Sequence, residues 1–195
     1  MNKVFSALIA VEAVLVAAGI AVASMKPAEL KTAGDSMPIN ACALLSSKDV
    51  AATIGKDVTD GERRDDGFIA DNPFVTAGTY SSTCFWRVVD PAFVPDPTLP
   101  LSGASFIMLN AMQWPDGDAG AHRFLQGFHD AFEAKAIDNK PIAVDVKDEA
   151  LWWGDGVAGR KRDRSYGISV HVVGDTKDQE RAREVTLAKK IASRL

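Results

Sequence analysis

Hydrophobic positions recur every three to four residues in three parts of the chain, and this period predicts helices. The first helix follows Ser46-Ser47-Lys48-Asp49, which has the pattern of a capping box, and ends at Gly55. The second helix covers residues 117–135, and the third begins at the Thr-x-x-Gln box of Thr176. The predicted buried stripes are Val50, Ala51 and Ile54; Phe124, Leu125, Phe128, Ala131 and Phe132; and Ala182, Val185, Ala188, Ile191, Ala192 and Leu195.

Alternation with a period of two predicts strands between these helices. Residues 79–90 place Cys84, Trp86 and Val88 on one face. Residues 104–114 are apolar on both faces, which predicts a strand covered on both sides. The remaining segments are predicted as a loop with one edge strand (56–78), a strand (141–146), a tight turn (147–156) and a hairpin of residues 157–162 and 168–173 joined by residues 163–167.

The order of these elements indicates one α+β domain over residues 39–195. Strands that follow each other through short connections pair antiparallel, so we expect a largely antiparallel, curved sheet flanked by helices. The length of 195 residues, with 47% hydrophobic residues, is sufficient for one hydrophobic core. The net charge of −4 excludes nucleic acid as a partner, because phosphate binding needs a basic surface.

The N-terminus has the pattern of an export signal over residues 1–23. A basic start at Lys3 precedes an apolar run, residues 4–23, that contains Glu12 and ends in Ala-Val-Ala, as signal peptidase requires. The alternative is that residues 4–23 stay uncleaved as a membrane anchor. Residues 24–38 are predicted to form a flexible linker. In both cases the domain lies outside the cytoplasm, in the periplasm, the cell envelope or the extracellular space.

Cys42 has three interpretations. Lipid attachment is disfavoured because Cys42 lies 19 residues after Ala23, beyond a polar linker. Nucleophilic catalysis is disfavoured because the segment around Cys42 is apolar and no histidine precedes His122. A disulfide is favoured, because the compartment is oxidising and Cys84 is the only other cysteine.

Three motifs resemble a family of exported domains of unknown function that is common among actinobacterial lipoproteins. They are CALLSSKDVAATIG at Cys42, CFW at Cys84 and VKDEALWW before the hairpin, and the resemblance covers about residues 40–195. It implies a Cys42–Cys84 bridge and an architecture similar to PsbP-like domains, but no catalytic residues. The chain departs from the family in having no lipid-attachment cysteine after the signal, and in Lys147 where the family has glycine.

A candidate metal site lies on the polar stripe of the second helix, where Asp118 precedes His122 by four residues and Glu133 follows His129 by four. Seven residues separate the two histidines by about 10.5 Å along a helix, too far for one ion. We therefore predict no metal and no cofactor, and keep a hydrolytic or metal-dependent enzyme using His122 or His129 as an alternative function.

A possible binding surface combines two adjacent tryptophans with a cluster of cations near the hairpin turn. Exposed tryptophan beside cations is common at recognition surfaces. The first functional hypothesis is a non-catalytic, exported envelope protein that binds an unidentified partner or ligand, of which an inhibitor of a secreted toxin or hydrolase is one form. The predicted binding residues are Trp152, Trp153, Arg160, Lys161, Arg162 and Arg164.

Overall fold

The structure, a computed structural model, describes residues 38–70, 75–91, 93 and 103–195. The predicted export signal and residues 24–37 of the predicted linker lie outside these residues. In the described part of the chain, no helix is both long and apolar enough to cross a membrane.

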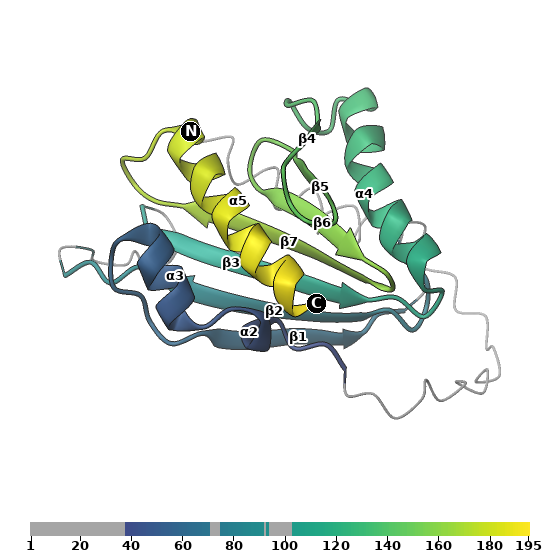
Figure 1. Cartoon of the computed structure of the whole chain (residues 1–195), viewed down its shortest axis with the longest axis horizontal. Helices are drawn as coiled ribbons and strands as arrows, with labels where there is room; N and C mark the ends of the chain where they lie inside the picture. Colours follow the sequence, from purple (N-terminus) through teal and green to yellow (C-terminus); the bar gives the residue numbers. More distant parts are fainter. Residues whose placement is uncertain (1–37, 71–74, 92, 94–102) are drawn as a thin grey trace, which may run out of the picture.

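The described residues form a seven-stranded antiparallel sheet with four helices, which confirms the predicted α+β class (Figure 1). The strand order is β1-β2-β3-β7-β6-β5-β4. The strands are β1 (Glu62–Phe68), β2 (Tyr80–Arg87), β3 (Phe106–Gln113), β4 (Ile142–Ala143), β5 (Glu149–Trp152), β6 (Val157–Lys161) and β7 (Arg164–His171). The helices are α2 (Ala41–Leu44), α3 (Ser47–Ile54), α4 (Asp118–Glu133) and α5 (Lys177–Arg194).

Both predicted capping boxes are present. The Asp49 N–H donates to Ser46 Oγ over 3.1 Å, and the Ser46 N–H donates back to the Asp49 carboxylate over 3.2 Å. Thr176 and Gln179 make the same reciprocal pair at the start of α5. Gly55 ends α3 with φ of 74°, a left-handed conformation that glycine adopts without strain.

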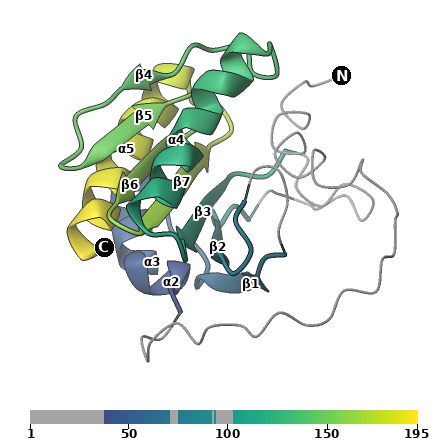
Figure 2. The same ribbon diagram turned by 90° about the vertical axis from the view of Figure 1, so that its right-hand side faces the viewer.

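The main core lies between one face of the sheet and the helices α2, α3 and α5 (Figures 1 and 2). The alternation in β2 is confirmed, because Cys84, Trp86 and Val88 all face this core. Cys42 in α2 forms a disulfide with Cys84, with a Cα–Cα distance of 5.0 Å. The bridge thus ties the start of the domain to the second strand.

A smaller core lies on the opposite face of the sheet, beneath α4. Its buried residues are Leu125, Leu151, Trp153 and Ala158. Figure 2 shows α4 over β6 and β7, whereas no described helix lies on this side of β1, β2 and β3. The prediction that β3 is covered on both sides is confirmed for its core face; on the other face its residues are half-buried and none of the described helices covers them.

Three local predictions are corrected. Residues 149–152, predicted as part of a turn, form β5 between β4 and β6. The hairpin connection is two residues long, because Lys161 pairs directly with Arg164, and Arg162 adopts φ of 54°. Strand β4 is only two residues long, and Ile142 is exposed.

The buried stripe of α5 is also different from the predicted one. Ala188, Ile191 and Ala192 are buried as expected, whereas Ala182 is exposed. The stripe instead extends towards the helix N-terminus through Leu187 and two glutamates. These glutamates, Glu180 and Glu184, are 6% and 1% exposed.

Candidate functional site

The two predicted tryptophans point to opposite faces of the sheet. Trp153 is 8% exposed and packs against Phe128 of α4, with ring centroids 5.5 Å apart. Trp152 faces α5, where its Nε1 donates to Glu184 and the Arg181 guanidinium lies 5.0 Å from its ring. Both indoles therefore have structural contacts that account for their positions.

Two of the four predicted cations are held by internal partners. Arg160 binds the carboxylates of Glu149 and Asp118. Lys161 Nζ donates to the Ala192 carbonyl near the end of α5 over 3.1 Å. Two cations of the hairpin turn form no ion pair with any described residue; these are Arg162, which is exposed, and Arg164, which is half-buried.

The tryptophans and the hairpin cations do not form one surface. Trp152 pairs with Val157 at the start of β6, whereas Arg162 and Arg164 lie beyond its other end at Lys161. Four residues of extended strand separate the two groups by about 13 Å. The prediction that the tryptophans and the hairpin arginines form one binding surface is therefore corrected, because they lie at opposite ends of β6.

His122 and His129 are both exposed on α4. His122 Nδ1 lies 3.9 Å from the Glu149 carboxylate, which is also bound by Arg160. The described residues contain no group of three or more histidine, cysteine, aspartate or glutamate side chains arranged to hold a metal ion.

The second face of β3 carries a row of large apolar side chains. On its core face, Ile107, Leu109 and Ala111 are 0% exposed. On its other face, Phe106, Met108 and Met112 are only half-buried. Strand β3 lies between β2 and β7 within the sheet, so this difference arises from what covers each face and not from an edge position.

Planar side chains make contact across four strands on this second face. The Arg64 guanidinium of β1 lies 5.8 Å from the Phe85 ring of β2, and Phe85 stacks on Phe106 at 5.5 Å. The imidazole of His171 on β7 lies 5.5 Å from Phe106. We call the surface formed by Phe85, Phe106, Met108, Met112 and His171 the aromatic face.

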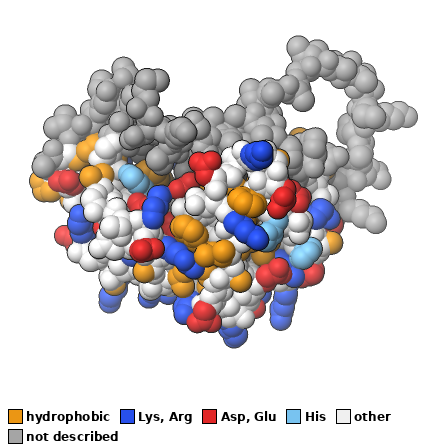
Figure 3. All heavy atoms as spheres, turned by 90° about the horizontal axis from the view of Figure 1, so that it is seen from above, with side chains coloured by type: hydrophobic (Ala, Val, Ile, Leu, Met, Phe, Trp, Pro, Cys, Tyr) orange, Lys and Arg blue, Asp and Glu red, His pale blue; other side chains and the backbone are white. Residues whose placement is uncertain are grey.

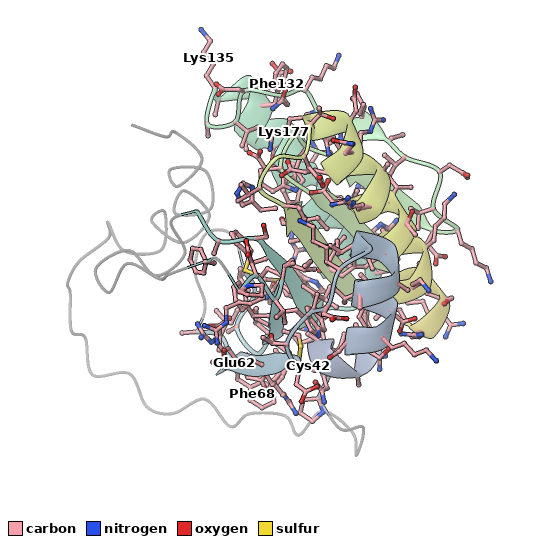
Figure 4. The ribbon with its side chains drawn as sticks, turned by 90° about the vertical axis from the view of Figure 1, so that its left-hand side faces the viewer. Cys42, Glu62, Phe68, Phe132, Lys135 and Lys177 are labelled. Atoms are coloured by element: carbon pink, nitrogen blue, oxygen red, sulfur yellow. A yellow bond between two sulfur atoms is a disulfide. The ribbon has the colours of Figure 1, made fainter. Side chains whose placement is uncertain are left out.

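The aromatic face continues into a polar row. The Asn110 side-chain amide donates to Ser81 Oγ and Thr83 Oγ1 of β2, each over 3.0 Å. In Figure 4, side chains project from the sheet into the space between β1, marked by Glu62 and Phe68, and the end of α4, marked by Phe132 and Lys135. Apolar groups beside fixed polar groups are typical of protein-binding surfaces.

Charge is distributed without a dominant sign. Acidic and basic side chains are interspersed over the described surface seen in Figure 3. Several lie in ion pairs, such as Arg63 with Asp65 and Arg123 with Asp116. This surface gives no support to a polyanionic partner.

Glu180 and Glu184, the carboxylate pair, lie beside β7 near the residue where β6 begins. Strand β6 begins opposite Ile168, so β7 has no β6 partner beyond that residue. The Val170 N–H donates to Glu184 Oε1 over 3.1 Å, and Trp152 Nε1 donates to Glu184 Oε2 over 3.0 Å. Through Glu184, helix α5 thus supplies the hydrogen-bond acceptor that a neighbouring strand would otherwise give to the Val170 N–H.

Burial raises the pKa of Glu184 to about 7. The hydrogen bonds from the Val170 N–H and the Trp152 indole oppose this rise, and the charge of Glu180 adds to it. A carboxyl group titrating near neutral pH is unusual enough to mark a possible functional position.

Sequence reasoning missed the carboxylate pair because charged residues were left out of the predicted stripe. A helical projection contains the signal that could have found it. Glu180 and Glu184 precede Ala188 and Ile191 at intervals of four, four and three residues, so all four share one face.

Comparison of this chain with protein-family models, with curated proteins and with solved structures finds no match. The resemblance to exported domains of unknown function, and the PsbP-like architecture that it implies, stay predictions from the sequence motifs.

Proposed function

We propose that this chain is an exported, non-catalytic domain that binds a partner protein in the cell envelope through the aromatic face. The observation that carries the proposal is the asymmetry of β3, whose apolar residues are fully buried on one face and half-buried on the other. Burying apolar side chains away from water is favourable, and a partner bound to this face would bury the half-exposed side chains of β3.

Export is supported by two independent features. The N-terminus has the pattern of a cleavable signal. The Cys42–Cys84 disulfide is compatible with an oxidising compartment, where such bonds persist. We place the domain in the periplasm or outside the cell, with residues 4–23 as an anchor if the signal is not cut.

The proposal moves the binding surface away from the residues predicted from sequence. Trp152, Trp153, Arg160 and Lys161 have internal contacts that explain them. Arg162 and Arg164 remain a predicted secondary contact, because they form no ion pair within the described chain. In one form of the proposal, the partner is a secreted toxin or hydrolase that this chain inhibits.

The test is capture of partners from the cell envelope by the tagged full chain. Met108→Glu places a charge in the centre of the aromatic face, and Thr186→Glu places the same charge on the exposed side of α5. We expect Met108→Glu to lose at least about 90% of the captured partner, because a buried unpaired charge disrupts a binding surface. Thr186→Glu should capture it normally.

Melting temperatures of both variants distinguish loss of binding from loss of the fold. Equal capture by a folded Met108→Glu variant contradicts the proposed surface. Loss of capture in an Arg162→Ala, Arg164→Ala variant, with Met108→Glu unaffected, would move the site to the hairpin turn. A captured hydrolase whose activity falls on addition of the chain would identify the inhibitor form.

A further inference from the structure

The carboxylate pair belongs to a cluster that contains more carboxylates than lysine and arginine side chains. Three carboxylates, those of Asp155, Glu180 and Glu184, lie near two cations. Lys177 Nζ is 2.8 Å from Asp155 and 3.1 Å from Glu180, and Arg181 lies over the Trp152 ring. With the nearby His171 neutral, these charges balance when one acid carries a proton.

Groups from every packed element contribute to this cluster. From β7, His171 Nδ1 lies 3.2 Å from Glu180 Oε1. From β5, Trp152 offers an N–H donor but no charge. The nearby Arg183 and Asp175 bind each other. Glu184 has two neutral donors, and among the described residues no cation contacts it directly; Lys177 favours its ionisation only from a distance. Of the acids in the cluster, Glu184 is therefore the one for which ionisation is least compensated.

We propose that Glu184 is a pH-sensitive latch, which holds the N-terminal half of α5 against the free edge of β7 while it is protonated and loosens that contact when it ionises. Opening would return the carboxylate to water and would uncover the Val170 N–H and Trp152 (Figure 4, where Lys177 marks the start of α5). The latch meets the aromatic face only at His171, which contacts both Phe106 and Glu180, and it does not depend on the proposed function.

The direction of the pH dependence follows from the raised pKa of Glu184, about 7 in the folded chain against an ordinary value of 4.5. A group with a raised pKa binds a proton more tightly in the closed state than in the open state. Its contribution to stability is complete below about pH 4.5 and is lost as the pH rises through about 7. The closed helix is therefore favoured by acid and opened by base.

The test is hydrogen–deuterium exchange of the full chain at pH 5.5 and pH 8.0, corrected for intrinsic exchange rates. We expect protection of the amides of residues 181–187 to fall at least about tenfold at the higher pH. Amides of α4 should not show this loss. In Glu184→Gln the fall should be less than about threefold, whereas the matched control Glu133→Gln, on an exposed position of α4, should behave as the wild type.

Glu180→Gln gives a second, independent readout. Removing the neighbouring negative charge should lower the pKa of Glu184, so the pH midpoint of α5 opening should move to lower pH. Unchanged protection of residues 181–187 in the wild type overturns the latch. A fall of protection in Glu184→Gln equal to that in the wild type also overturns the latch. If Glu184→Gln does not fold, an unchanged pH midpoint of α5 opening in Glu180→Gln overturns it instead.

Discussion

The disulfide between Cys42 and Cys84 fixes the start of the domain against strand β2. Cys84 is fully buried, and Gly61 lies so close that an added Cβ would stand 2.8 Å from the Cys84 sulfur. The pairing could be predicted from the cysteine count and the export signal alone. The roles of Glu180 and Glu184 could not be predicted in the same way, since burial of a carboxylate depends on the partners that the fold brings to it.

The disulfide prediction belongs to this scale. In the chain-entropy model, closing a loop between residues 42 positions apart stabilises the folded state by about 4 kcal/mol. We expect Cys42→Ala, Cys84→Ala to lower the free energy of unfolding by about this amount in urea titration. Reducing agent should weaken the wild type equally and leave the variant unchanged. A loss below about 1 kcal/mol would show that the bridge contributes little.

At the scale of elements, predictions succeeded where the signal was local. The capping boxes at Ser46 and Thr176 act within four residues, and the alternation in β2 depends on one covered face. Strand β5 was missed because its neighbours Lys147, Asp148 and Gly154 have the composition of a turn. Its pairing comes from β4 and β6, which no local pattern can specify.

Two glycines of α4 provide a matched prediction. A Cβ at Gly120 would contact Asp116 and lie 2.8 Å from the Trp114 ring, whereas a Cβ at Gly127 would meet no atom within 4 Å. Gly120→Ala should therefore destabilise the protein by about 1–3 kcal/mol through overpacking. Gly127→Ala should stabilise it by up to about 1 kcal/mol, because alanine favours the helix. Thermal or urea unfolding checks both, and the same sign for the two would contradict this packing.

At the scale of the whole molecule, the position of α4 decides which surfaces are available. The helix follows β3 in sequence yet lies over β6 and β7, so it fills only part of its side of the sheet (Figure 2). The sequence shows that both faces of β3 are apolar, but it does not show where on the sheet α4 packs. The aromatic face is the consequence, and it could be recognised only from the assembled sheet.

Site-specific photo-cross-linking in intact cell envelopes tests the central claim most directly. A photoreactive amino acid replaces Met108 on the aromatic face or, as a control, Thr186 on the exposed side of α5. We predict a discrete cross-linked partner from position 108 and none from position 186. Absence of a cross-link at 108, in a variant that keeps the wild-type melting temperature, or the same products from both positions, would contradict partner binding through this face.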